Sequence, residues 1–247
     1  MKRILYLGTD PKEFASKATG CEVTHYPVIQ IVPRKVDSLD IQQAYADLDK
    51  YTHCIFTSKN AVEIFFDHLE LMGKKFVDKQ VIAVGSVTAS HLAEQGVMTP
   101  WVAQEETQEG IIALLKTLDL HNAYLFIPQS SRSRPVLLAF LSEAKISYRA
   151  CHIYDTVVQV LEPKPFWEMY DQVVFTSPST VEAFLSIFGQ LPPQGQCLAI
   201  GPVTRSSLLS HIEKKPKRRF GVLKGKMKIA KDFDAPLPDG LFADFEM

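Results

Sequence analysis

The stretch FTSKNAVEIFF at residues 56–66 occurs a second time, as FTSPSTVEAFL at residues 175–185. Six of the eleven positions are identical, and the two copies begin 119 residues apart. Each copy runs from a short apolar segment through two adjacent hydroxyl residues into a segment with the apolar spacing of a helix. The repeated stretch therefore predicts a strand, a turn and a helix, present twice in one chain.

Two further segments recur in the same order. VIAVGSVTASHL at 81–92 matches CLAIGPVTRSSL at 197–208 at six of twelve positions, and residues 4–8 weakly resemble residues 124–128. The offsets of these pairs are 116 and 120 residues, close to that of the first repeat. Recurrence at a nearly constant offset indicates a duplicated unit of about 120 residues.

Short apolar runs alternate with helical patterns along the chain. This alternation is typical of parallel sheets that are covered by helices. We expect strands at 3–8, 23–32, 52–57, 80–85, 123–128, 148–160, 172–176 and 196–200, and helices around 59–71, 86–95, 107–118, 134–144, 179–188 and 202–213. The predicted fold is α/β, with two similar parallel-sheet three-layer domains joined by a two-stranded hinge linker.

Two extended stretches, HYPVIQIVP at 25–33 and CHIYDTVVQV at 151–160, do not fit compact strand–helix units. We interpret them as the places where the chain crosses to a second domain and returns. The predicted boundaries are 1–30 plus 158–247 for domain one, 36–150 for domain two, 27–35 and 151–160 for the crossing linkers, and 214–247 for an atypical tail. The alternative is two consecutive halves that divide near residue 120.

Composition excludes several classes of protein. The 247 residues are 46% hydrophobic and carry a net charge of −1, which provides no bulk field for binding nucleic acid or an acidic membrane. The apolar run after Lys2-Arg3 is too short for a signal peptide, and no run is long enough for a membrane span, so we expect a cytoplasmic protein. The four cysteines and seven histidines show no metal-ligand spacing, so we expect no metal.

Polar residues gather at the predicted strand ends. Asn60 with Glu63, and Ser179 with Glu182, have capping-box spacing, so we assign Asn60 and Ser179 as helix caps. This assignment leaves Thr57-Ser58 and Thr176-Ser177 free, at the edge of a parallel sheet where ligands bind.

The segments Gly85–Thr88 and Gly201–Thr204 repeat this arrangement. Hydroxyls and free N–H groups at helix starts suit an anion, and four such turns favour a shared cleft for a large ligand with dispersed anionic groups. The alternative is that duplication preserved purely structural caps.

Two arginines follow the predicted strand at 123–128. Arg132 and Arg134 either reach into this cleft or lie at a solvated helix start. The phosphate-loop and dinucleotide-binding glycine patterns do not occur in the chain.

Taken together, these motifs resemble the uroporphyrinogen-III synthase family in order and spacing. The resemblance rests on FTSKNAV (56–62), VGSVTA (84–89), Arg134 with Leu137 and Leu141, IYDT (153–156), FTSPSTVEAF (175–184) and IGPVT (200–204). It implies a hydro-lyase that needs no metal or organic cofactor. Its substrate would be hydroxymethylbilane, a linear tetrapyrrole with eight carboxylates, which loses water and closes with inversion of ring D to give uroporphyrinogen III.

The resemblance also implies roles for particular residues. Tyr154 would donate a proton to the departing hydroxyl. The candidate substrate-binding residues are Thr57, Ser58, Thr88, Arg134, Thr176, Ser177, Ser179 and Thr204. We expect a monomer without nucleic-acid or membrane partners.

Two features depart from the family pattern. Asp10 stands where the family often has arginine, which is unfavourable near a polycarboxylate unless Asp10 faces away. The tail at 214–247 weakly resembles C-terminal tails of small bacterial antitoxins. It is interpreted as a divergent strand at 226–230 with a short helix, a disordered tail, or an interaction segment with its own partner. The alternative function is an inactive synthase-like or hinge-bending anion-binding protein with a partner-binding tail.

Overall fold

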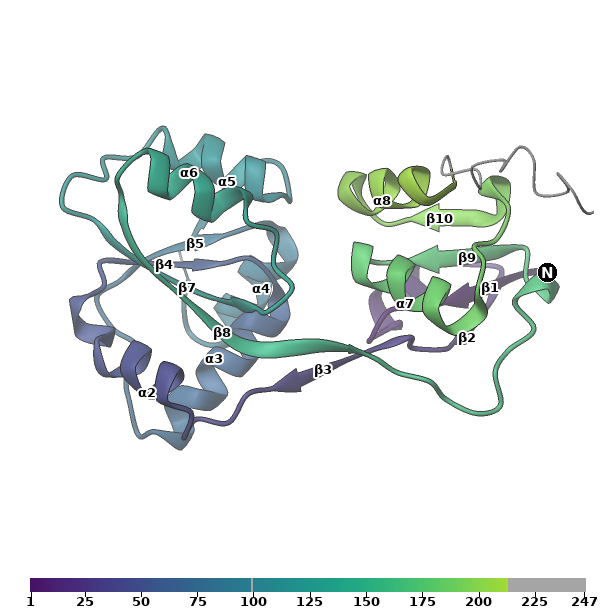
Figure 1. Cartoon of the computed structure of the whole chain (residues 1–247), viewed down its shortest axis with the longest axis horizontal. Helices are drawn as coiled ribbons and strands as arrows, with labels where there is room; N and C mark the ends of the chain where they lie inside the picture. The colour runs from purple at the N-terminus through teal and green to yellow at the C-terminus, as the bar shows by residue number, and fades with distance from the viewer. Residues whose placement is uncertain (99, 213–247) are drawn as a thin grey trace, which may run out of the picture.

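A computed structural model of the chain describes residues 1–98 and 100–212. Figure 1 shows two α/β domains joined by a long strand and a short strand that pair with each other. The tail at 214–247, and every interpretation of it, lies outside the described residues.

Within the described residues, the first domain has a four-stranded parallel sheet in the order β10-β9-β1-β2. Its elements are β1 (Lys2–Tyr6), α1 (Lys12–Lys17), β2 (Cys21–His25), the 3-10 helix η2 (Trp167–Met169), β9 (Gln172–Phe175), α7 (Pro178–Phe188), the 3-10 helix η3 (Gln194–Gln196), β10 (Cys197–Ala199) and α8 (Pro202–Ile212). The central strands β1 and β9 come from distant parts of the chain and pair with Leu5 opposite Val173. This sheet is therefore discontinuous in sequence.

The second sheet, in the described part of the chain, has six strands in the order β3-β8-β7-β4-β5-β6. The elements of this part are β3 (Ile29–Pro33), α2 (Leu39–Ala46), the 3-10 helix η1 (Leu48–Lys50), β4 (His53–Phe56), α3 (Lys59–Leu71), β5 (Gln80–Ala83), α4 (Ser86–Glu94), β6 (Trp101–Val102), α5 (Gln108–Leu115), β7 (Tyr124–Ser130), α6 (Val136–Glu143) and β8 (Ser147–Val158). All neighbouring pairs are parallel except β3 with β8. An antiparallel edge strand therefore ends an otherwise parallel sheet.

Helices cover both faces of each sheet, as the three-layer prediction requires. In the second domain, Cys54 and Phe56 of β4 enter a core with α2, α3 and α4, whereas Ile55 enters a separate core with α5 and α6. In the first domain, Leu5 packs in the core with α7 and α8, and Ile4 packs on the opposite face near α1. Because successive side chains of a strand point to opposite faces, each of these strands contributes to the cores on both sides of its sheet.

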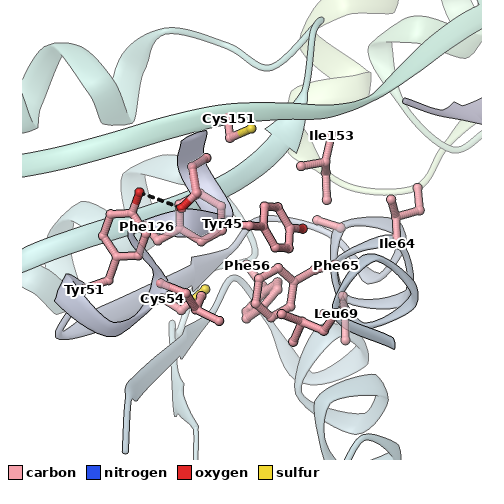
Figure 2. Packing of buried hydrophobic residues seen from close by; sticks show 14 of the residues in the cluster. Tyr45, Tyr51, Cys54, Phe56, Ile64, Phe65, Leu69, Phe126, Cys151 and Ile153 are labelled. Carbon is pink, nitrogen blue, oxygen red and sulfur yellow. Dashed lines mark hydrogen bonds between the residues drawn. The ribbon is translucent and has the colours of Figure 1, made fainter. Parts of the chain in front are cut away.

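The duplicated stretch produces the same aromatic contact twice. The rings of Phe56 and Phe65 lie 5.3 Å apart at 69°, and those of Phe175 and Phe184 lie 5.4 Å apart at 72°. These four side chains are completely buried, which confirms that the aromatics of the repeat form core. Figure 2 shows the larger cluster around Phe65, where Tyr51 stacks on Phe126 with ring centroids 4.8 Å apart.

The strands β3 and β8 form the connection between the domains. Their antiparallel register runs from Ile29 opposite Val158 to Pro33 opposite Tyr154. The first part of β8 pairs with β7 in the second sheet, so one continuous strand serves both a sheet and the connection. The exact domain and linker boundaries given above stay a prediction.

The expected strand at 23–32 was wrong, because it is two strands in two sheets. Tyr26 and Val28 donate backbone hydrogen bonds to Tyr6 and Leu7 of the first domain, and β3 starts only at Ile29. Sequence reasoning also missed α1, α2 and β6. No residue of α1 is buried and β6 has only two residues, so neither gives an apolar periodicity long enough to detect.

The helices within residues 1–98 and 100–212 differ from membrane spans in length and composition. None of them is both long enough and apolar enough to cross a bilayer.

We predict that Leu69→Ala destabilises the protein by about 2–5 kcal/mol, because Leu69 is only 3% exposed in the core under α3. Leu71→Ala, in the same helix but 73% exposed, is the matched control and should change the unfolding free energy by less than about 0.5 kcal/mol. Urea denaturation measures both. Equal losses for the two variants would contradict the packing described here.

Candidate functional site

The repeated turns lie at equivalent places in the two domains, between β4 and α3 and between β9 and α7. Ser58 Oγ accepts a hydrogen bond of 3.1 Å from the Ala61 backbone N–H. Ser177 Oγ accepts one of 3.3 Å from Thr180 N–H, and Thr180 Oγ1 accepts one of 3.2 Å from Ser177 N–H. The serines of the repeated phrase are therefore the helix N-caps.

The assignment of Asn60 and Ser179 as caps was wrong. Both residues lie inside their helices, which begin at Lys59 and Pro178. The true capping partner of Ser177 is Thr180, which the Ser/Thr-x-x-Glu/Gln pattern does not include. Pro178 at the first helical position was the signal that could have located this cap.

As helix caps, Ser58 and Ser177 have only part of their hydrogen-bonding capacity left for a ligand. Each hydroxyl oxygen already accepts a helix N–H, but its proton remains available for donation. The other two turn residues, Thr57 and Thr176, are half-buried. The Thr176 methyl lies against Gly8, where an added Cβ would come within 2.6 Å of it, so the loop after β1 can approach this turn only with glycine.

Tyr154 is brought together with Ser58. Its phenolic oxygen lies 2.9 Å from Ser58 Oγ, and the side chain is only 5% exposed. Burial raises the pKa of Tyr154, and the hydrogen bond with Ser58 opposes that rise in part. The phenol is thus protonated at neutral pH and is oriented by the cap of α3.

The second pair of turns is more enclosed than the sequence suggested. Thr88 and Thr204, in the first turns of α4 and α8, are 4% and 3% exposed. At the start of α4, a Glu106 carboxylate oxygen accepts hydrogen bonds of 3.1 Å from both the backbone N–H and the hydroxyl of Ser86. A carboxylate of the chain itself therefore occupies this helix start.

The two arginines after β7 are held by carboxylates. Arg134 makes a bidentate pair with Glu109, with both N–O distances 2.7 Å, and this hydrogen bonding lowers the pKa of Glu109 to about 2. Arg132 pairs with Glu182 of α7, which connects the loop after β7 to the first domain. Within the described residues, neither arginine pairs with the hydroxyl turns.

A cavity of about 480 Å³ opens beside β3, and residues from both domains line it. Thr9 and Asp10 approach from the loop after β1, and Lys59, Asn60 and Glu63 approach from the start of α3. Asp10 therefore does not face away from the cavity. Its pKa is lowered chiefly by the backbone N–H of Lys12 and further by Lys59, a residue that sequence reasoning did not select.

Known proteins are similar to this chain in sequence and in fold. A family model described as "Uroporphyrinogen-III synthase HemD" matches residues 12–213. "Putative uroporphyrinogen-III synthase" of Methanothermobacter thermautotrophicus is 27% identical over 201 residues, covering 75% of this chain and 78% of that protein. "Porphyrin biosynthesis protein HemD" of Ruminiclostridium josui is 26% identical over 214 residues, covering 78% of this chain but only 42% of that longer protein.

Solved structures share the fold. A mutant uroporphyrinogen III synthase from the extremely thermophilic bacterium Thermus thermophilus superposes with a TM-score of 0.60 at 19% identity, covering 85% of this chain and 89% of that chain. Uroporphyrinogen-III synthetase from Helicobacter pylori gives a TM-score of 0.55 at 18% identity, covering 86% and 89%.

The fold and these matches define the class as a two-domain α/β enzyme. The chain belongs to the uroporphyrinogen-III synthase family, whose members are lyases of porphyrin biosynthesis.

We predict that Ser177→Ala lowers the unfolding free energy by about 1 kcal/mol, because α7 loses its cap. Ser179→Ala is the matched control, since Ser179 lies inside the helix, and should cost less than about 0.5 kcal/mol. Chemical denaturation of both variants measures the difference. A larger cost for Ser179→Ala would restore the cap assignment made from sequence.

We predict that the Arg134–Glu109 pair makes stability depend on acid pH. The pKa of Glu109 is lower in the folded chain than its ordinary value of about 4.3, so the stabilisation is complete above that value and is lost as the pH falls toward about 2. Because Glu109 is 51% exposed, the loss should stay below about 1 kcal/mol.

Urea midpoints at several pH values between neutrality and acid measure this dependence. Glu109→Gln should flatten it, whereas Glu70→Gln, an exposed glutamate on α3, should leave it unchanged. An identical acid profile for wild type and Glu109→Gln would contradict the prediction.

Proposed function

We propose that this chain is a uroporphyrinogen-III synthase that converts hydroxymethylbilane to uroporphyrinogen III with loss of water and inversion of ring D. The observation that carries the proposal is the buried Tyr154 phenol 2.9 Å from the Ser58 cap. Family membership supports the reaction class. The hydroxyl turns and helix starts suit the substrate, because they offer dispersed donors to its carboxylates.

Tyr154 is the proton donor in this proposal. Its phenol delivers a proton to the terminal hydroxyl, which departs as water and leaves an electrophilic azafulvenium cation. A phenolate remains on the buried Tyr154 after the transfer. Ser58 can donate a hydrogen bond to the phenolate oxygen and so stabilise its negative charge. The proton that the pyrrole carbon releases when the macrocycle closes then restores the phenol.

The remaining catalysis is positioning. The two domains hold a folded conformer of the linear substrate and exclude closure without inversion. Thr57, Thr176 and Ser177 lie at the turns, Ser179 lies in the first turn of α7, and all four can offer hydroxyls or backbone N–H groups. Thr88 and Thr204 are enclosed, so we propose that they shape the helix starts, with contact to substrate requiring local opening.

In this proposal, the arginines bind substrate only after they exchange their present carboxylate partners for carboxylates of the substrate. Arg132 and Arg134 are paired with Glu182 and Glu109, so a substrate carboxylate must replace those partners. Asp10 lines the cavity beside β3, and its negative charge disfavours an anion there unless Lys59 compensates. Monomeric state, cytoplasmic location and a partner for residues 214–247 stay predictions.

We predict that the protein, incubated with freshly made hydroxymethylbilane, gives the III isomer on chromatographic separation. Tyr154→Phe should lower kcat by about 10²–10⁴-fold, because the proton donor is lost. The matched control is Tyr148→Phe, a partly buried tyrosine on the same strand whose hydroxyl contacts Ser142, and it should retain activity.

Two results would contradict the proposal. Production of isomer I alone, as in a blank without protein, would favour the inactive synthase-like or anion-binding alternative. Normal turnover by Tyr154→Phe would keep the enzyme but remove Tyr154 from its mechanism.

A further inference from the structure

The strand that carries Tyr154 is irregular at that residue. Along the pairing of β7 with β8, Gln129 lies opposite His152, but the next residue, Ser130, lies opposite Tyr154. Ile153 is skipped, which is the pattern of a β-bulge. Consecutive residues of a regular strand point to opposite faces, yet Ile153 and Tyr154 are both buried in the same core. The bulge therefore turns the Tyr154 side chain toward Ser58.

Two residues hold the backbone of this bulge. The Arg34 N–H donates to the Ile153 carbonyl at 2.8 Å, and the Ser131 N–H donates to the Tyr154 carbonyl at 3.1 Å. Arg34 lies just beyond β3 and Ser131 just beyond β7, so the bulge is held from both neighbouring strands.

The same two residues also meet at the Asp155 side chain. Its carboxylate accepts two hydrogen bonds from the Arg34 guanidinium, at 2.9 and 2.8 Å, and one from the Ser131 hydroxyl. A bidentate guanidinium–carboxylate pair fixes relative orientation as well as distance. The side chains of Arg34 and Asp155 are 39% and 35% exposed, so water reaches the pair only in part.

We propose that Arg34, Ser131 and Asp155 form a clamp that positions Tyr154. Arg34 and Ser131 donate hydrogen bonds to the backbone of the bulge, and Asp155 is the residue that follows Tyr154. In the described contacts, none of the three touches the phenol oxygen. They are thus positioning residues. Their effect on catalysis rests on the proposed function, whereas their effect on the place of the Tyr154 ring does not.

The charge of Asp155 agrees with this role. Hydrogen bonding from Arg34, and then from Ser131, lowers the pKa of Asp155 to about 2, so the carboxylate is ionised at neutral pH. Arg149 forms a similar pair with Asp40, with an N–O distance of 2.6 Å, in the first half of the same strand. It lies before the bulge and makes a matched control.

The test follows the Tyr154 ring directly. Protein labelled with ¹³Cζ-tyrosine is compared by NMR, with the Tyr154 resonance assigned by its loss in Tyr154→Phe. We expect Arg34→Met and Asp155→Asn to shift or broaden that resonance, and Arg149→Met to leave it in place. Asp155→Asn keeps the shape of the side chain, so it remains informative if Arg34→Met fails to fold.

Kinetics with hydroxymethylbilane give a second readout. Arg34→Met should lower kcat by about 10–100-fold with little change in KM, because the donor is displaced while the binding turns remain. Arg34→Lys, which keeps the charge but loses the fork, should recover part of the loss. Combining Arg34→Met with Tyr154→Phe should cost no more than Tyr154→Phe alone, because both changes act through one group.

The proposal is overturned if the Tyr154 resonance is the same in Arg34→Met, Asp155→Asn and wild type, or if the two losses in kcat multiply. If the wild type makes no isomer III, the proposed function fails, and the NMR comparison still decides whether the clamp positions Tyr154.

Discussion

The antiparallel pairing of β3 with β8 is the contact on which the rest of the structure depends. A chain that passes between two sheets exposes backbone N–H and C=O groups, which need partners. Here the outgoing and returning segments partner each other from Ile29–Val158 to Pro33–Tyr154. Before β3 begins, Tyr26 and Val28 donate backbone hydrogen bonds to the first domain. At the other end of the ladder, the first part of β8 pairs with β7 in the second sheet. The backbone ladder thus joins both domains (Figure 1).

The same pairing explains why the proposed proton donor lies where it does. Tyr154 is the one residue of β8 that the described registers place opposite both neighbouring strands, with Pro33 of β3 on one side and Ser130 of β7 on the other. Its phenol meets Ser58, which also caps α3, so structure and proposed chemistry share one hydroxyl. A small set of contacts at the domain connection therefore couples the place of the phenol to the place of the helix start.

Most of the fold was predictable, because it depends on patterns that repeat locally. The helix at 59–71 agrees with α3 in both bounds, since its apolar spacing and its buried residues coincide. The site was predicted less well. Ser58 and Ser177 were placed correctly at the strand ends, but they were expected to be free of capping and are in fact the helix caps. Which residue caps a helix depends on which hydroxyl reaches the N–H three residues later. The glutamates that seemed to complete capping boxes contact other elements instead, Glu63 with His91 and Glu182 with Arg132.

By itself, the sequence determined the duplicated α/β design, the strand-end turns and the burial of the paired aromatics. Apolar periodicity is a property of a single segment, and the repeat appears when the sequence is compared with itself. Both can therefore be recognised without knowing which segments are in contact in the folded protein. Only the tertiary structure decided the partners of Arg132, Arg134 and Glu106, because charged side chains find partners across distances in sequence that no spacing rule encodes. It alone also revealed the bulge beside Tyr154, since a register shift is a relation between two strands.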